Sequence, residues 1–269
     1  MMRAHASVAL AFLLITIVPA MAEDVVLLHA AGSLRAALTE VAKAFEAAGL
    51  GKVQPRFGAS GLLKDEIVAG AKAEVFASAN MEHPQALVME KRSGSVELFA
   101  RNRLCALVRP GLEITTASLL DRMLDPQIKL GTSTPKADPS GDYAWEVFRK
   151  AEKISPSASA ALEKKALQLT GGPTSPPAAQ GRSVYGELVA QGTADIFLTY
   201  CTNALTAQRE NPAQQIVRLP DTLAVGADYG LTVMNGASVP AYKFALFILS
   251  AEGQRTLAKH GFAAPALPQ

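Results

Sequence analysis

The stretch VVLLHAAGSLRAALTEVAKAFEA, residues 25–47, passes from an apolar strand-like run through a Gly-Ser corner into the pattern of an amphipathic helix. The same transition recurs at VQPRFGASGLLKDEIVAG, residues 53–70, where Ser60 stands at the corner as Ser33 does in the first stretch. A strand that leads at once into a helix is the unit from which α/β sheets are built. The two corners therefore predict an α/β fold with a serine where each helix begins.

Strand-like and helix-like segments continue to alternate along the chain. The apolar runs at 73–79 and 127–133 are each followed by a helix pattern, and 102–110 and 194–201 have the composition of further strands. This alternation predicts mainly parallel sheets flanked by helices. The stretch TGGPTSPPAAQG, residues 170–181, is predicted to be a loop, because its prolines and glycines do not suit regular structure.

The first 22 residues, MMRAHASVALAFLLITIVPAMA, have the three parts of a secretory signal peptide: Arg3, an apolar core at 8–18, and small residues that end at Ala22. A membrane anchor is the alternative, but the apolar core is shorter than the roughly 20 residues of a spanning helix. We therefore expect export, cleavage after Ala22 and a periplasmic location. No cysteine lies near the cut, so a lipid anchor is not expected.

Charge and motifs exclude several classes of function. The formal net charge is +2, and it falls to +1 when Arg3 leaves with the signal, which argues against nucleic acid as a partner. The sequence has no GxxxxGK[ST] loop, no HExxH and no zinc-type cysteine spacing, so we expect no cofactor and no bare metal cation. The hydrolase pattern G-x-S-x-G fails at Ser60, because Leu62 stands where glycine is required.

The chain has two cysteines, Cys105 and Cys201, and the compartment expected for it permits disulfides. A bridge between them would stabilise the fold by up to about 4 to 5 kcal/mol in the chain-entropy model. The alternative is a pair of buried thiols that behave as small apolar side chains. The spacing of the two residues leaves both interpretations open.

Four serines stand at or near predicted helix starts: Ser33, Ser60, Ser140 and Ser183. Helix capping explains any one of them, since serine is a preferred N-cap residue. As a set they lie beyond strand ends, where open α/β sheets bind ligands. Each helix start also carries a partial charge of about +0.5, so four would oppose about two negative charges. The set predicts a site for an anion rich in hydrogen-bond acceptors.

Four segments around these corners resemble one protein family. The segments are 30–46 (AAGSLRAALTEVAKAFE), 57–80 (FGASGLLKDEIVAGAKAEVFASAN), 130–148 (LGTSTPKADPSGDYAWEVF) and 189–200 (VAQGTADIFLTY). In order and spacing they are similar to the periplasmic molybdate-binding proteins, the solute receptors of molybdate ABC importers. The resemblance extends from about residue 25 to HGFAAP at 260–265.

The resemblance implies a two-lobed fold that closes by a hinge on a dehydrated tetrahedral oxyanion. It divides the mature chain into lobe one, residues 23–104 plus 228–269, and lobe two, residues 105–227. Molybdate is the expected ligand, an ABC permease of the inner membrane is the expected partner, and the receptor is expected to be a monomer. A receptor of this kind makes and breaks no bond, so no catalytic residue is predicted.

The family's ligand contacts fall on five positions. Ser33 and Ser60 would each offer a hydroxyl and an amide, Tyr200 a hydroxyl, and Ser140 an amide at a helix start. The remaining amide falls on Arg182, where the family has a small or apolar residue. The guanidinium of Arg182 would either add a charge-assisted contact to the anion or point to solvent.

Several alternatives stay open. Tungstate comes first, then sulfate or a different anion recruited by Arg182. Phosphate carries a proton at neutral pH and would need an acceptor such as Asp138 or Asp142. A more distant alternative is an exported serine hydrolase, which would require a histidine such as His29 and a carboxylate to converge on Ser33 or Ser60. An iron receptor that uses several tyrosines is a further one.

Overall fold

The computed structural model describes residues 25–176 and 182–265. The predicted signal peptide and the second half of the predicted 170–181 loop lie outside the described residues. The strands are β1 (Val25–Ala31), β2 (Lys52–Gly58), β3 (Val75–Ser78), β4 (Glu97–Val108), β5 (Leu130–Ser133), β6 (Leu167–Thr170), β7 (Ile196–Tyr200), β8 (Gln215–Arg218) and β9 (Gly226–Val233).

A short 3₁₀ turn, η1 (Gly32–Leu34), joins β1 to the first helix. The helices are α1 (Arg35–Ala47), α2 (Ser60–Val68), α3 (Glu82–Met89), α4 (Leu119–Leu124), α5 (Pro139–Glu152), α6 (Ala158–Lys165), α7 (Val184–Ala190), α8 (Cys201–Glu210), α9 (Val239–Leu249) and α10 (Ala251–Lys259). Both strand-to-helix corners of the sequence are present, since β1 leads through η1 into α1 and β2 leads into α2.

In the described residues the strands form one nine-stranded sheet, in the order β2-β1-β3-β9-β4-β7-β5-β6, with β8 beside β4. The outer ladders are parallel: β1 pairs with β2 and β3, and β5 pairs with β6 and β7. The central ladders, which involve β4 and β9, are antiparallel. The α/β class is therefore confirmed, and the predicted parallel pairing holds for the outer strands alone.

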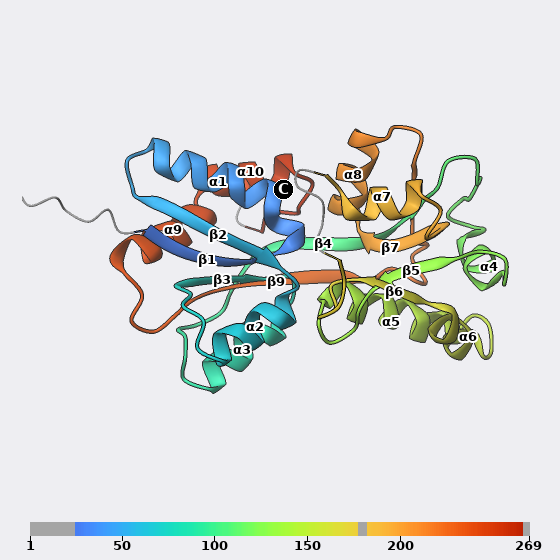
Figure 1. The fold of residues 1–269 in the computed structure, drawn as a ribbon, viewed down its shortest axis with the longest axis horizontal. Coiled ribbons are helices and arrows are strands. Elements are labelled where there is room, and N and C mark those ends of the chain that lie inside the picture. Colours follow the sequence, from blue (N-terminus) through green and yellow to red (C-terminus); the bar gives the residue numbers. More distant parts are fainter. Residues whose placement is uncertain (1–24, 177–181, 266–269) are drawn as a thin grey trace, which may run out of the picture.

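The strand β4 belongs to both parts of this sheet. It pairs with β9 up to Arg103, and from Leu104 onward it pairs with β7 and β8. In Figure 1, β4 runs from the part that carries α1, α2 and α9 to the part that carries α5, α7 and α8. The elements on the two sides therefore meet around the middle of β4.

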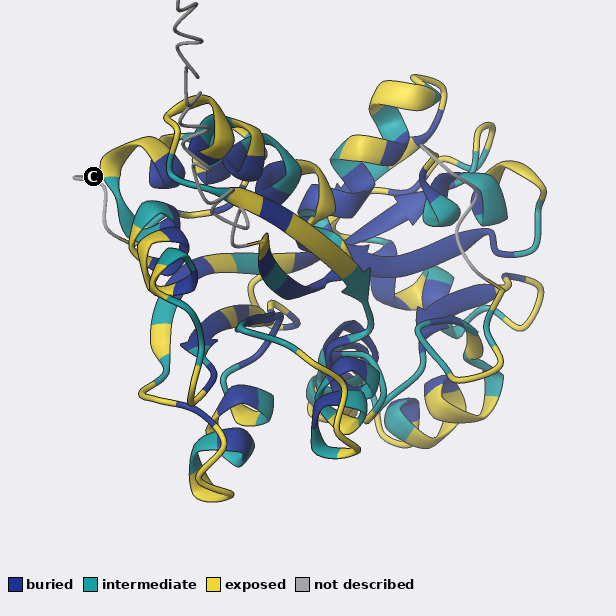
Figure 2. Ribbon diagram, turned by 60° about the vertical axis from the view of Figure 1, so that its left-hand side comes forward, coloured by how far each residue is buried: buried dark blue, intermediate teal, exposed yellow. Residues whose placement is uncertain are grey.

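Each part is built around its own apolar cluster. In the first part α1 buries Leu38, Val41 and Phe45, spaced three and four residues apart, and Phe45 packs edge to face on Phe244 of α9 at 5.1 Å between ring centroids. In the second part α5 buries Phe148 among residues of β5 and β7. Figure 2 shows the buried strands inside and the exposed outer faces of the helices. No helix in the described ranges has the length and apolar character to cross a membrane.

Candidate functional site

A cavity of about 850 Å³ lies between the two parts of the sheet. It is lined at the carboxyl ends of β1, β2 and β3 on one side and of β6 and β7 on the other. Ligands of α/β proteins bind beyond the carboxyl ends of strands, which makes this cavity the candidate site. Four of the five predicted ligand residues line it, namely Ser33, Ser60, Arg182 and Tyr200.

Ser60 and Tyr200 come from opposite sides of the cavity and bind the same backbone residue. The hydroxyl of Ser60 accepts a hydrogen bond from the amide of Ala79 at 3.1 Å, and the hydroxyl of Tyr200 donates to the carbonyl of Ala79 at 3.4 Å. Ser60 and Tyr200 are only 1% and 2% exposed. The loop after β3 thus brings the two predicted side chains together.

Ser33 is held by a chain of hydrogen bonds that starts on β4. The side-chain amide of Asn102 donates to the hydroxyl of Tyr229 at 3.3 Å and to the hydroxyl of Thr202 at 2.9 Å. Tyr229, on β9, shares a hydrogen bond of 3.0 Å with the hydroxyl of Ser33. Tyr229 accepts from Asn102, and in its contact with Ser33 either hydroxyl is able to donate.

The hydroxyls of Ser33 and Ser60 both line the cavity. Ser60 accepts a hydrogen bond from the amide of Ala79, which leaves its own proton to be donated. Neither serine caps its helix, since the N-cap residues of α1 and α2 are Leu34 and Ala59, without a side-chain cap. Simple capping thus does not account for these two serines.

Ser140 differs from the other predicted residues, because it is buried outside the cavity lining. Its amide donates to the carboxylate of Asp138 at 3.0 Å, and Asp138 is the N-cap of α5. The hydroxyl of Ser140 makes no hydrogen bond within the described residues. Asp138 itself lines the cavity. Burial raises the pKa of its carboxyl to about 6, although the hydrogen bonds that the carboxylate accepts lower the pKa.

The start of α7 carries two more polar groups. Arg182 lies at the rim with its side chain 65% exposed, and its Nε is 3.2 Å from a carboxylate oxygen of Glu187. The amide of Ser183 donates to both carboxylate oxygens of Glu210, at 3.0 and 2.9 Å, and the hydroxyl of Ser183 caps α7 by accepting from Gly186. The amide of Ser183, next to Arg182, is thus already hydrogen-bonded to the carboxylate of Glu210.

Sequence reasoning missed two groups of cavity residues. The first is a polar row on α8, Asn203, Thr206 and Glu210, whose spacing of three and four residues places them on one helix face. The second is Arg35 of α1, whose guanidinium lies 4.8 Å from the ring centroid of Phe57. Burial lowers the pKa of Arg35 from its usual value. The spacing of Asn203, Thr206 and Glu210 was the signal in the sequence that could have identified the α8 row.

Cys105 of β4 and Cys201, the first residue of α8, form a disulfide. The bridge lies next to Tyr200, which pairs with Leu104 in the ladder between β7 and β4. It therefore joins the end of the strand that carries Tyr200 to the strand shared by both parts of the sheet.

His29 does not have the position of a catalytic base. It is buried in β1 outside the cavity lining, and its Nδ1 has no partner in the described residues. Burial, followed by the nearby Arg56, lowers the pKa of His29. The hydroxyl of Ser60 is bound to a backbone amide instead of a histidine.

Metal-ligand chemistry has little support in the same region. Residues 25–176 and 182–265 contain no group of three His, Cys, Asp or Glu side chains arranged to hold a metal ion. Burial raises the pKa of Tyr200 and of Tyr229 well above the usual value, so both phenols are protonated when no cation is bound.

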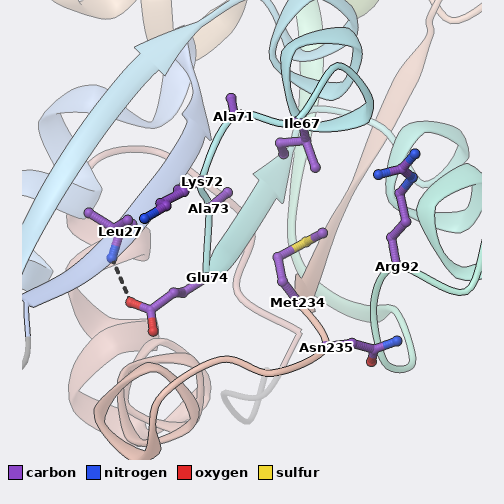
Figure 3. A pocket seen from close by; sticks show the side chains of 10 residues that line it. Leu27, Ile67, Ala71, Lys72, Ala73, Glu74, Arg92, Met234 and Asn235 are labelled. Atoms are coloured by element: carbon purple, nitrogen blue, oxygen red, sulfur yellow. Dashed lines mark hydrogen bonds between the residues drawn. The ribbon is translucent and has the colours of Figure 1, made fainter.

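A second cavity, of about 550 Å³, lies near the start of β3 (Figure 3). Its polar lining consists of Lys72, Glu74, Arg92 and Asn235. The carboxylate of Glu74 already accepts hydrogen bonds from the amides of Leu27 at 3.0 Å and Ser238 at 2.8 Å, so Glu74 has a structural role. None of the residues predicted for the ligand lines this cavity.

Several known proteins are similar to this chain in sequence or in fold. An uncharacterised protein of Pasteurella multocida, PM1146, is 34% identical over 237 residues, which cover 87% of this chain and 96% of the relative. The molybdate-binding protein ModA of Mycobacterium tuberculosis is 26% identical over 253 residues, covering 89% and 85%. The sulfate-binding protein SubI of M. tuberculosis has the same fold, with a TM-score of 0.76 at 18% identity and coverage of 90% and 87%.

The family model for the bacterial extracellular solute-binding proteins matches residues 26–263, almost the whole of the described chain. Together with the relative named as a molybdate-binding protein, this match confirms the resemblance that the serine corners predicted. The predicted solute-binding fold is likewise confirmed. This chain belongs to the bacterial extracellular solute-binding proteins.

Proposed function

We propose that this chain is the solute receptor of an ABC importer, that it captures a tetrahedral oxyanion by hinge closure, and that molybdate is the first candidate. The observation that carries the proposal is that the hydroxyls of Ser33 and Ser60 line one cavity, and that Ser60 already accepts from the amide of Ala79, so its own proton is left to donate to a ligand. An oxyanion without protons has acceptors alone, so it matches hydroxyl donors. The molybdate-binding relative supports the choice of anion.

The proposed contacts are the hydroxyls of Ser33, Ser60 and Tyr200 at the inner end of the cavity, with Arg182 at the rim. A contact from Tyr200 requires that its hydroxyl exchange the carbonyl of Ala79 for the ligand. A contact from the amide of Ser140 requires that this amide exchange Asp138 for the ligand. Charge-assisted hydrogen bonds are the strongest kind available to such a site, and they offset the cost of removing the anion from water.

The proposed hinge has two points. The first lies between Arg103 and Leu104, where β4 changes partners, and the second lies at the start of β9, where the chain passes back to the first part of the sheet. Leu104 donates to the carbonyl of Val225 at 3.2 Å, so the two crossing segments are bound to each other. These positions support the predicted lobes at 23–104 plus 228–269 and at 105–227. Rotation about such a crossing is how two-lobed receptors close on a ligand.

Export, a periplasmic location, a monomeric state and delivery to an inner-membrane permease are parts of the same proposal. No catalytic step is included, since no acid or base group in the described residues reaches the hydroxyl of Ser60. A receptor needs none, because its task ends with release of an unchanged ligand.

The proposal is tested by the thermal unfolding of the mature chain with molybdate, tungstate, sulfate and phosphate in turn. A ligand that binds only the folded state raises the melting temperature, by an amount that grows with its concentration over Kd. We expect the largest rise with molybdate or tungstate. A melting temperature that none of the four anions changes would reject the oxyanion assignment, and a rise with sulfate alone would replace molybdate.

A further inference from the structure

We propose that the oxyanion bound at Ser33 and Ser60 is the head group of a phosphate monoester whose body, bearing hydroxyl or amino groups, lies in the outer cleft. The outer cleft is the part of the cavity beyond the serines, lined by Arg35, Thr39, Arg182, Thr206 and Glu210. This inference rests on the proposed function, because it keeps the serines as the anion site and adds a class of substrate.

The outer cleft is too long for an inorganic anion alone. The lining continues from Gly32 to Thr39 through η1 and the start of α1, and along α8 from Asn203 to Glu210. Seven residues of α-helix advance about 10 Å. A five-atom oxyanion is no larger than a few water molecules, each of which takes about 30 Å³ in the liquid. Such an anion would fill only the inner end of the cavity, and the outer cleft, where Thr206 and Glu210 are exposed, leaves room for an organic body.

The volume of the cavity does not result from a separation of the two parts of the sheet. The amide of Gly61, at the start of α2, donates to the carbonyl of Ala137 at 2.9 Å across the cavity mouth. A Cβ atom on Gly61 would lie 2.5 Å from the carbonyl oxygen of Lys136, so the two backbones are already in close contact there. Further closure at this point is blocked, and the outer cleft stays open beside it.

The charges of the cavity also fit a larger ligand. Asp138 and Glu210 are acceptors, and both are bound to backbone amides that an inorganic oxyanion would otherwise use. A carboxylate repels any dianion, organic or inorganic. Hydroxyl or amino donors on the same molecule offset this repulsion by hydrogen bonds to the carboxylate, and an inorganic oxyanion without protons has none.

Two arginines complete the recognition chemistry. Arg35 lies over the ring of Phe57 on one wall, and Arg182 lies on the other, where its contact with Glu187 leaves much of the side chain exposed. Guanidinium groups bind phosphate and carboxylate oxygens in pairs. The same cavity thus offers donors for an anionic group and acceptors for a hydroxyl or ammonium group.

The experiment compares organic and inorganic ligands by calorimetry on the mature chain. The probes are glycerol 3-phosphate and O-phosphoserine, set against inorganic phosphate and molybdate. We expect at least one organic probe to bind ten times more tightly than inorganic phosphate. If neither organic probe exceeds inorganic phosphate, the inference is overturned, while tight molybdate binding in the same series would leave the proposed function intact. If all four probes fail to bind, both are rejected.

A matched pair of variants tests where the organic body lies. Thr206→Phe narrows the outer cleft, and we expect the ratio of the affinity for the organic probe to that for inorganic phosphate to fall at least tenfold. Arg209→Phe places the same side chain on α8 outside the cavity lining, and the ratio is expected to stay as it is in the parent. An equal ratio in Thr206→Phe and the parent would overturn the proposed position. Circular dichroism of both variants checks that they are folded.

Discussion

The hydroxyl of Tyr229 lies 3.0 Å from the hydroxyl of Ser33, and this contact connects a strand at the centre of the sheet to the candidate anion site. Tyr229 also accepts from Asn102 of β4. The orientation of Ser33 therefore depends on two strands that are distant from it in sequence.

We expect Tyr229→Phe to weaken anion binding and to lower the free energy of unfolding by about 1 kcal/mol, the usual net value of one hydrogen bond. The change removes the hydroxyl that orients Ser33 and leaves the ring in place. Calorimetry with molybdate and urea denaturation measure the two effects. Tyr242→Phe is the matched control, because Tyr242 is half exposed on α9. Equal affinities in the Tyr229 variant and the parent would show that Ser33 needs no support from β9.

Ser60→Ala is expected to weaken molybdate binding by about 1.5 to 3 kcal/mol, the range for hydrogen bonds to charged groups. The variant also leaves the amide of Ala79 without its acceptor, so stability is measured alongside affinity. Ser95→Ala, at an exposed position between α3 and β4 and outside the cavity lining, is the control. Calorimetry that finds an unchanged affinity would remove Ser60 from the site.

Replacing both Cys105 and Cys201 by alanine is expected to lower the free energy of unfolding by about 2 to 5 kcal/mol, since the bridge closes a loop with a sequence separation of 96. Urea denaturation of the variant and the parent measures the difference. Thiol labelling of the denatured parent adds a direct check, because both cysteines should react after reduction and neither before it. Labelling without reductant would contradict the bridge.

Stability should depend on pH through Asp138. The pKa of its carboxyl is about 6 in the folded chain, raised chiefly by burial, and near 4 when unfolded. Between these values the folded state holds a proton that the unfolded state has lost, so this group makes stability fall as the pH rises from about 4 to 6. The loss is complete above the folded pKa and amounts to at most about 3 kcal/mol.

Asp138→Asn keeps a good N-cap residue and removes the titration. The free energy of unfolding of the variant minus that of the parent should therefore increase between pH 4 and pH 6 and then level off. Denaturation of both proteins at a series of pH values gives this difference. The contributions of all other titratable groups cancel, because the variant and the parent share them. A difference that stays constant with pH would mean that Asp138 titrates normally.

The strand-to-helix corners were predictable because they are local. Residues 25–47 and 53–70 contain both the apolar periodicity and the polar corner, and the structure has a strand and a helix in each. The antiparallel ladders of β4 were not predictable, because the partners of a strand depend on contacts between residues far apart in the sequence. The helix α8 was missed since CTNALTAQRE has little apolar periodicity.

The site was predictable in part for the same reason. Ser33 and Ser60 stand at the ends of recognisable strands, which indicated a ligand site, whereas the role of Tyr200 was implied by the family resemblance. The burial of Ser140 depends on the side chain of Asp138 two residues earlier, and the role of Glu210 depends on an amide 27 residues away. Such pairings are set by three-dimensional packing, and a single sequence does not reveal them.

The shared strand β4 also limits which relative motions the molecule permits. In the described chain, the part that carries α1 is joined to the part that carries α8 by two backbone segments, at Arg103–Leu104 and at Val225–Gly226, and these segments are bound side by side. Sliding of one part along the other would break the ladder, whereas bending at these two peptides costs a few torsion angles. The proposed rotation about the line through both crossings would change the width of the cavity mouth without moving the serines relative to one another.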